Sequence, residues 1–595
     1  MDRNSVIGFI LIGIILMIWM WYNTPHTPPQ QVQNIDTIQQ EKIAEKIPEQ
    51  APVQEEIVSS QKDSLGKYFS KFATGEEKIA IIETDHYTAE ITTKGGLIRK
   101  WELKEYKTWD KKHPVQLVDF DKGGDFSVLF NSSDGRLINT KNLYFSGNIT
   151  NWQRIKLEKD SSYKITFILD IGNGAKLEKL LTFKNKKYSI DVEYKLIKME
   201  PIIANFEYQV TWENGLRYAE HNSVDESKNA HAFAYAGGEL TTLDASGEEL
   251  SKTNISGITD WIATRNKYFA VAIISKDKKS TGAYLEGYSI KMPNNGLKKT
   301  YTIALKMPYY GDKDSLARFE LFLGPLDFDI VKSYKVDLDQ IMSLGAAWII
   351  RPIAEYFMIP LFQFLRSFIP NYGIVIIIFS IIIKLLLHPL TKSSMRSMQK
   401  MQALQPMIEE VREKYKSDPQ KMNQAIMRLY KDYGVNPAGG CLPLLLQLPI
   451  LYALWAVFSS AIELRQAHFI WWITDLSVPD VLITLPFAIP IFGIRELSGL
   501  ALAMGITMFI QQKLTVKDPR QKMMIWLMPL LLTLLFNFLP SGLNLYYFMF
   551  NLLSIVQQIY VTKKHKNEPL RKVEPKKKSG GIMSKLSQNM PKMKK

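Results

Sequence analysis

The sequence is nearly free of cysteine, with Cys441 the single one among 595 residues. A single cysteine excludes a disulfide within the chain, so cysteine content does not indicate a redox compartment. The sequence also lacks Cys and His residues at metal-ligand spacing, a phosphate-cradling glycine loop and a nucleophile elbow. Its apolar segments lack carboxylate ladders and nucleotide motifs. We therefore predict no cofactor, no metal, no catalytic residue and no energy-coupled pump.

The net charge of +15 is uneven along the chain. The C-terminal tail (562–595) carries twelve Lys and Arg against two Glu. Positive charge beside the last apolar segment indicates a cytoplasmic tail. It also favours contact with anionic lipids or ribosomal RNA.

The N-terminus has the pattern of an uncleaved signal anchor. Residues 1–22 contain an apolar run closed by interfacial aromatic residues, without a small-residue cleavage site. Residues 23–65 are rich in Pro, Gln and Glu, which predicts a disordered linker. The anchor is therefore expected to begin in the cytoplasm and to lead into an extracytoplasmic region.

The region 66–340 is too large for a loop, and its apolar pattern has a period of two. We predict strands at 163–171, 187–197, 204–213, 267–275 and 299–307. Many such strands, with NG, GG and DG turn signals between them, favour a large antiparallel β-sandwich. We interpret scattered Asp, Glu and Trp residues there as surface and core, in preference to a sugar site.

Residues 346–369 are apolar but carry polar groups on one helical stripe. These groups are Arg351, Glu355, Gln363 and Arg366. The pattern predicts an amphipathic helix that lies in the membrane interface on the extracytoplasmic side.

The remaining apolar segments predict a polytopic α-helical membrane core over 370–561. With the anchor they give six spans, and both termini are cytoplasmic because Lys and Arg gather in alternate short loops. The five spans of the core are 372–391, 438–461, about 497–513, 523–539 and 541–561.

A cytoplasmic helical hairpin is predicted at 392–435. Asp418 is expected to cap its second helix, with Pro419 at the first helical position. Its Met-rich stripe fits either a plain seam between two helices or a docking surface for a partner. The sequence leaves both readings open.

Lys384 lies inside the second span, with three Ile before it and three Leu after it. A cation at such depth costs roughly 2.5–3.5 kcal/mol on insertion scales, so it normally faces a protein interior or a water-filled cavity. The alternative is that the side chain snorkels to the nearby interface. We favour the cavity, because a Pro/Gly-interrupted span follows.

Other polar residues occur at matching depths in the spans. Ser380 lies one turn before Lys384, and the remainder are Gln447, Gln511, Gln512, Asn544 and Asn551. Each alone is typical of a helix–helix hydrogen bond. Converging on Lys384, they would hydrate a groove and lower the cost of moving polar segments into the bilayer.

Four segments of the core resemble the YidC/Oxa membrane protein insertase family. They are KLLLHPLTKSSMRSMQKMQALQPMI, YGVNPAGGCLPLLLQLPILYAL, ELRQAHFIWWITDLS and LPSGLNLYYFMFNLLSIVQQ. The anchor followed by a large β domain resembles the Gram-negative type. That resemblance implies a periplasmic β-super-sandwich and a location in the bacterial inner membrane.

The resemblance also implies roles for single residues. The groove cation of the family, usually an arginine, falls on Lys384, and the hydroxyl one turn earlier falls on Ser380. The aromatic pair that lines the substrate slide falls on Tyr546 and Tyr547. Lysine keeps the charge but lacks the bidentate fork of arginine.

We therefore expect a membrane protein insertase and chaperone, and not an enzyme. Its expected partners are nascent membrane proteins, the Sec translocon, the ribosome (through the hairpin and the tail) and anionic lipids. A small-solute transporter is the first alternative, although no inverted repeat is visible. An intramembrane hydrolase with a Ser380–Lys384 dyad is the second, although no oxyanion donors are evident.

Overall fold

The computed structural model describes residues 65–564, apart from 248, 278–279, 312–313, 347, 436–441, 490–492 and 517–521, together with residue 572. This part of the chain forms two compact units, one ending at Ser343 and the other beginning at Leu344. The predicted anchor (1–22), nearly all of the linker (23–65) and most of the tail (562–595) lie outside the described residues.

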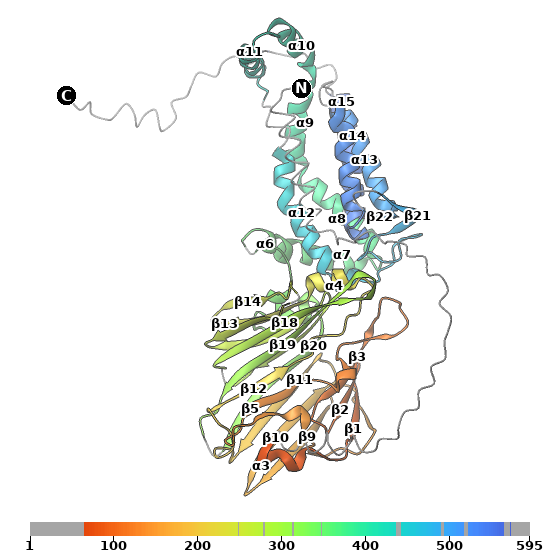
Figure 1. Ribbon diagram of the computed structural model, residues 1–595. Helices are drawn as coiled ribbons and strands as arrows, with labels where there is room; N and C mark the ends of the chain where they lie inside the picture. The colour runs from red at the N-terminus through yellow and green to blue at the C-terminus, as the bar shows by residue number, and fades with distance from the viewer. Residues whose placement is uncertain are drawn as a thin grey trace, which may run out of the picture. The chain divides into compact units, whose positions relative to one another are not determined.

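Three sheets form the first unit (Figure 1). The five-stranded sheet has the order β4(Pro114–Gln116), β3(Ile98–Lys107), β2(Tyr87–Thr92), β1(Ile79–Glu83), β8(Gln153–Lys156). The nine-stranded sheet has the order β14(Glu239–Leu243), β13(His231–Ala236), β16(Thr259–Arg265), β17(Phe269–Ser275), β20(Asp314–Pro325), β11(Ser189–Ile197), β10(Ala175–Lys184), β9(Ser162–Gly172), β7(Ser146–Gly147). The six-stranded sheet has the order β15(Ser251–Ser256), β18(Gly282–Met292), β19(Gly296–Pro308), β12(Glu207–Trp212), β5(Ser127–Asn131), β6(Leu137–Asn139). All pairings are antiparallel except that of β1 with β8.

The strand predictions are confirmed: β9, β11, β12, β17 and β19 each cover most of a predicted segment. Alternation explains why, since every second side chain of β10 is buried. The short helix α4(Ser223–Asn229) connects β12 to β13, while α3(Gly66–Phe69) precedes β1 and α5(Phe328–Lys332) follows β20. Trp101, Trp212 and Trp261 are fully buried in the core of this unit.

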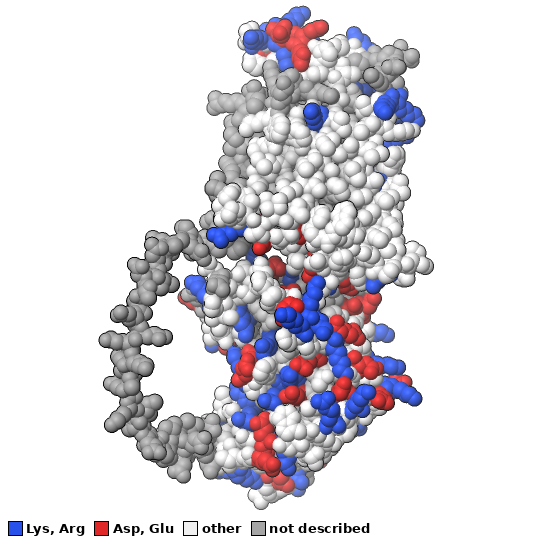
Figure 2. All heavy atoms as spheres, turned by 90° about the vertical axis from the view of Figure 1, so that its right-hand side faces the viewer, with Lys and Arg blue, Asp and Glu red and all other residues white. Residues whose placement is uncertain are grey.

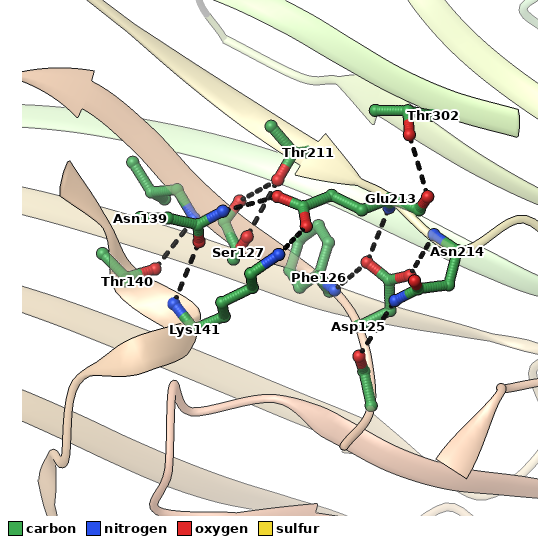
Figure 3. A network of polar contacts seen from close by, with 12 residues as sticks. Asp125, Phe126, Ser127, Asn139, Thr140, Lys141, Thr211, Glu213, Asn214 and Thr302 are labelled. Atoms are coloured by element: carbon green, nitrogen blue, oxygen red, sulfur yellow. Dashed lines mark hydrogen bonds and ion pairs between the residues drawn. The ribbon is translucent and has the colours of Figure 1, made fainter. Parts of the chain in front are cut away.

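A polar network joins loops of the six-stranded sheet (Figure 3). The Asp125 carboxylate accepts hydrogen bonds from the backbone N–H groups of Phe126, Glu213 and Asn214, each at 2.8 Å. The Glu213 side chain in turn contacts Asn139 and Lys141. Burial raises the pKa of Asp125 to about 6. All of these groups have partners, so the network serves to hold the loops together.

Lys179 connects all three sheets of the unit. It lies in β10, and its Nζ donates to the carbonyl oxygens of Gly96 and Phe126, both at 2.8 Å. Gly96 belongs to the turn between β2 and β3, and Phe126 precedes β5. The ammonium group also lies 4.6 Å from the centre of the Phe126 ring. Burial lowers the pKa of Lys179 to about 7.

The second unit is mainly helical (Figure 1). Its elements are α6(Ile350–Ile353), a π-helical turn at Ala354–Met358, α7(Ile359–Phe368), α8(Tyr372–Leu386), α9(His388–Ala403), α10(Gln405–Lys414), α11(Pro419–Asp432), α12(Leu442–Ser460), a short 3-10 helix at Ile462–Leu464, β21(Val481–Ile489), β22(Ile494–Ser498), α13(Gly499–Thr515), α14(Lys522–Phe536) and α15(Ser541–Lys564). Contacts join α15 to α8, α12 and α13, and α13 to α14. A core of Ala501, Met504 and Phe536 lies among the last three helices.

The predicted span 372–391 is not one straight helix, and this prediction requires correction. The helix α8 ends at Leu386, and a 67° bend separates it from the helix that follows. Pro389 explains the break, because proline has no N–H to donate and its ring clashes with the preceding turn of a helix.

The segment 346–369 also forms a shorter helix than expected. Helix begins at Ile350, and a π-helical turn precedes α7, which has Pro360 in its first turn. Arg351 and Glu355 form an ion pair at 3.5 Å across one turn. Apolar side chains remain exposed along it: Tyr356, Phe357, Phe364 and Phe368. An exposed apolar face is what an interfacial helix requires.

Helices occupy the predicted cytoplasmic hairpin. The Asp418 side chain accepts from the backbone N–H of Lys421, so the predicted cap is confirmed. Leu404, Ile408 and Val435 form a small buried cluster between α10 and α11. The apolar pattern of 392–435 includes Met401, Ile426, Leu429 and Tyr433, which pack against this cluster. Part of the stripe is therefore a two-helix seam.

Among the described residues, no single helix is both long enough and apolar enough to cross a membrane. The bent pair Tyr372–Leu386 and Thr391–Ala403 is long and apolar enough when its two helices are taken together, and shorter apolar helices cover Gln447–Ser460 and Ile525–Phe536.

Candidate functional site

The site is built first by α8. Asn371 caps this helix, because its side chain accepts from the backbone N–H groups of Gly373 and Ile374. The buried residues of α8 recur at three- and four-residue spacing: Val375, Ile376, Phe379, Ser380, Ile383 and Lys384. Helical periodicity therefore places both Ser380 and Lys384 on the buried face.

Lys384 is enclosed by α15. Only 8% of its surface is exposed, and its Nζ donates to the Ser554 hydroxyl at 2.6 Å. The ammonium group also lies 4.3 Å from the centre of the Phe550 ring. A hydroxyl and an aromatic face both stabilise a cation without neutralising it. Lys384 thus faces α15 in the protein interior, which favours the cavity over the snorkelling alternative.

Ser380 does not pair with Lys384. Its hydroxyl donates to the carbonyl oxygen of Ile376 at 2.7 Å, one turn back in the same helix. Because the ammonium group of Lys384 is directed to Ser554, the two residues do not form the dyad that the hydrolase alternative requires.

A row of buried polar groups runs along α15. Within the described residues, six side-chain atoms on α15 make no hydrogen bond: the hydroxyls of Tyr546 and Tyr547, the amide nitrogens of Asn551 and Gln558, and the amide oxygens of Asn544 and Gln557. A buried polar group without a partner costs about 1–3 kcal/mol. The buried face of α15 is therefore more polar than helix packing alone requires.

The aromatic pair Tyr546 and Tyr547 lies inside the helix packing. Tyr546 is buried, with its ring 6.4 Å from Phe379 of α8 and 5.9 Å from Phe550. Tyr547 packs edge-on against Phe536 of α14 at 4.9 Å. Tyr546 thus packs toward α8 and Tyr547 toward α14. The role of this pair as a substrate slide remains a prediction.

Gln447 does not bond to the lysine among the described residues. It lies half-buried on α12. Asn551 lies on α15, three residues before Ser554, and is buried. Of the residues predicted for the groove, Lys384 joins α8 to α15, and Ser380 and Asn551 are buried on these two helices.

The polar row continues at the start of α9. The Gln557 amide nitrogen lies 3.1 Å from both the Thr391 hydroxyl and the His388 Nδ1. Further along, Gln399 donates to the Thr562 hydroxyl and Gln402 to the Thr515 carbonyl. These bonds attach α9 to α13 and α15 at the end of the unit where basic residues follow.

Sequence reasoning missed Ser554 and Gln558. Their signal was the spacing of Asn551, Ser554 and Gln558, which places three polar residues on one face of an apolar helix. No group of three His, Cys, Asp or Glu side chains that could hold a metal ion occurs among the described residues.

Two family models match the chain, one over each unit. The model of the 60Kd inner membrane protein family matches residues 364–568, and that of the YidC periplasmic domain matches residues 80–356. The crystal structure of an active YidC insertase with its first transmembrane domain resolved shares 20% identity over 85% of this chain and 98% of that chain, with a TM-score of 0.35.

Curated relatives match nearly the whole chain. The membrane protein insertase YidC of Chlorobaculum parvum is 39% identical over 569 residues, which are 94% of each chain. That of Chlorobium luteolum is 38% identical over 593 residues, or 98% of this chain and all of the relative. With the α8–α15 site and the large β unit, these similarities show that the chain belongs to the YidC family of membrane protein insertases.

Proposed function

We propose that this chain inserts nascent membrane proteins through a polar groove between α8 and α15, with Lys384 as its central cation. The main support for this proposal is the buried Lys384, which contacts Ser554 and Phe550. Polar groups that make no hydrogen bond among the described residues lie along the same helix, α15. The family assigns membrane insertion, and these contacts supply a chemical route for it.

The groove would act by lowering a desolvation cost. A client segment that enters lipid carries backbone and side-chain polar groups, and each unsatisfied group costs several kcal/mol in hydrocarbon. The free amide nitrogens of Asn551 and Gln558 can donate to such groups or to water. The family implies that Tyr546 and Tyr547 line the slide for the apolar part of the client.

Lys384 would select for acidic tails. A cation in a medium of low dielectric attracts a carboxylate more strongly than in bulk water. Its partners are one neutral hydroxyl and one aromatic ring, so its charge stays uncompensated among the described residues. An Asp or Glu entering the groove would provide the missing counter-charge.

The wider arrangement follows the family. The protein is an inner membrane protein with a periplasmic domain. We further propose six spans with both termini cytoplasmic, a periplasmic β-super-sandwich, and an interfacial helix at 346–369. The basic tail and the hairpin α10–α11 would contact the ribosome and anionic lipids, and the core would work alone or beside the Sec translocon.

Reconstituted insertion tests the role of Lys384. Proteoliposomes that contain only this protein would receive single-span clients whose translocated tails are either acidic or neutral. Lys384→Arg should keep most of the activity, because both side chains are long cations. Lys384→Ala should lower insertion of acidic-tailed clients several-fold and leave neutral ones nearly unchanged.

The control variant is Lys392→Ala, which removes an exposed lysine eight residues further along the chain. Loss of Lys384 should not unfold the protein, since the Ser554 hydroxyl still donates to the Phe550 carbonyl at 2.7 Å. Equal insertion of acidic clients by the Ala and Arg variants, at equal abundance, would show that the electrostatic mechanism is wrong. The same vesicles report solute flux and peptide cleavage, which the transporter and hydrolase alternatives require.

A further inference from the structure

A two-stranded hairpin formed by β21 and β22 projects from the helical unit, and its apolar side chains are uncovered. The exposed fractions are 46% for Leu482, 48% for Ile483 and 59% for Phe487. Ile483 and Thr484 are consecutive residues in regular register with β22, so they point to opposite sides of the hairpin, and both are exposed. Neither side of β21 is therefore packed against the described protein. The nine residues of this strand carry no charge.

The base of the hairpin is held firmly. The buried Asp480 carboxylate accepts from the Trp472 indole nitrogen at 2.9 Å, the Ser498 hydroxyl at 2.5 Å and the Leu500 backbone N–H at 2.8 Å. The Asn537 side chain accepts from the Ser498 N–H and donates to the Glu496 carbonyl oxygen. These bonds attach both strands to α13 and α14, so the exposed apolar surface belongs to an anchored element.

The loop that precedes the hairpin contacts the residues at which α8 and α15 begin. Asn371, before α8, donates to the Phe469 carbonyl at 3.2 Å. Ser541 and Gly542, at the start of α15, donate to the carbonyls of Val478 and Leu476 at 2.9 Å. The stacked pair Trp471 and Trp472 lies in the same loop, with Trp471 78% exposed. Tryptophan is enriched where a membrane meets water.

From these observations we infer that the β21–β22 hairpin lies in the membrane interface and buries its apolar side chains among lipid headgroups and upper acyl chains. In water, an exposed apolar strand of this length would invite aggregation. In the interface, Leu482, Ile483 and Phe487 leave water, while Arg495 and Glu496 of β22 can pair with headgroups. The helical unit shown in Figure 2 agrees, since its face is mostly uncharged and Lys and Arg gather at one end.

Two features exclude other placements of the hairpin. Among the described residues each strand pairs only with the other, so both have an open edge, and unpaired backbone groups cost several kcal/mol each in hydrocarbon. The hairpin therefore belongs in the interface and not in the bilayer core. Pro486 has no N–H and interrupts the edge of β21, which opposes addition of a client strand.

Depth-dependent quenching in the full-length protein tests this inference, which rests on the proposed membrane placement of α13–α15. Cys441 would be replaced by Ser, and single cysteines at Leu482 or Phe487 would carry an environment-sensitive fluorophore. The vesicles would contain phosphatidylethanolamine and phosphatidylglycerol. A lipid quencher near the acyl carbonyl should quench both labels several-fold more than one near the chain end, and aqueous iodide should quench them weakly.

Two reference positions make the result decisive. Leu137→Cys, on an exposed strand of the β unit, should be quenched by iodide alone. Leu530→Cys, exposed on α14, should be quenched most by the deep lipid quencher, and its failure would reject the membrane placement itself. Three outcomes would overturn the inference. The hairpin labels could be quenched by iodide as strongly as the label at position 137, they could be quenched most by the deep lipid quencher, or they could be protected from all quenchers. The last outcome would mean that protein covers the hairpin.

Discussion

Two buried lysines show how differently one residue type is stabilised within this chain. Lys384 has a neutral hydroxyl and an aromatic face as partners. Lys179 has two carbonyl oxygens at 2.8 Å and also lies over an aromatic ring. The contacts of Lys179 join three sheets and serve the fold, whereas Lys384, the proposed groove cation, lies on the same helix contact as polar groups that make no hydrogen bond among the described residues. Burial alone therefore does not distinguish a structural lysine from a functional one.

The pKa of Lys179 predicts a pH dependence of stability. Its folded pKa is about 7, below the ordinary value of 10.5, so the unfolded chain binds more protons than the folded chain between these pH values. The contribution of Lys179 to the free energy of unfolding should therefore rise from pH 7 to pH 9, by about 2 kcal/mol for a shift of this size. Urea midpoints from tryptophan fluorescence of the β unit would measure it.

Lys179→Met is the variant that isolates this effect. Methionine keeps much of the apolar stem but cannot titrate, so the rise in the urea midpoint should disappear. The exposed Lys252, in an edge strand, offers the control Lys252→Met, which should leave the rise intact. An unchanged rise in Lys179→Met would assign the pH dependence to other groups.

At the scale of the element, capping and proline placement decide where the helices begin and end. Asn371, Asp418 and Ser498 each cap a helix with a side-chain oxygen. Pro389 separates α8 from α9 and so shortens the predicted span. A bend at this point places the Met-rich helix and the apolar helix on different axes, although the sequence reads continuously through both.

Asp480 is predicted to hold the β21–β22 hairpin in place. Asp480→Ala would leave the Trp472 indole and the Leu500 N–H without their acceptor, at a cost of about 1–3 kcal/mol for each buried group. Amide hydrogen exchange of segment 481–498 in vesicles should then become several-fold faster. Asp475→Ala is a matched control, because the Asp475 carboxylate bonds only within its own turn, to Ser477. Equal exchange in the two variants would contradict the anchoring role.

The whole molecule combines two units whose surfaces differ in chemistry. Charged residues are frequent on the β unit, whereas the helical unit is largely uncharged on the face shown in Figure 2. The β unit ends at Ser343, before the first described helix of the second unit. The residues proposed for the groove all lie in the helical unit. The insertion step is thus expected to need the helical unit alone.

Removal of the β unit tests this division. A variant that lacks residues 66–343 but keeps the helical unit should still insert simple single-span clients at a measurable rate. The comparison is with Lys384→Ala in the same truncated chain, which should again impair acidic-tailed clients. A stable truncated protein without any insertion activity would show that the β unit takes part directly.

The sequence by itself determined the class of protein and most of its elements. Alternation with a period of two located strands such as β9 and β11, and three-four spacing located the helices of the hairpin. The cap at Asp418 was readable because its partners lie within one turn. The family motifs pointed to Lys384. Local periodicity carries this information because burial repeats with the geometry of the backbone.

Only the tertiary structure decided which groups meet. Ser554 is 170 residues from Lys384, and no local pattern pairs the two. Lys179 reads as an ordinary strand residue until its three sheets are assembled. The β21–β22 hairpin also escaped prediction, since a short apolar run beside a helix can be read as part of that helix. Contacts between distant segments depend on packing, which a single sequence does not record residue by residue.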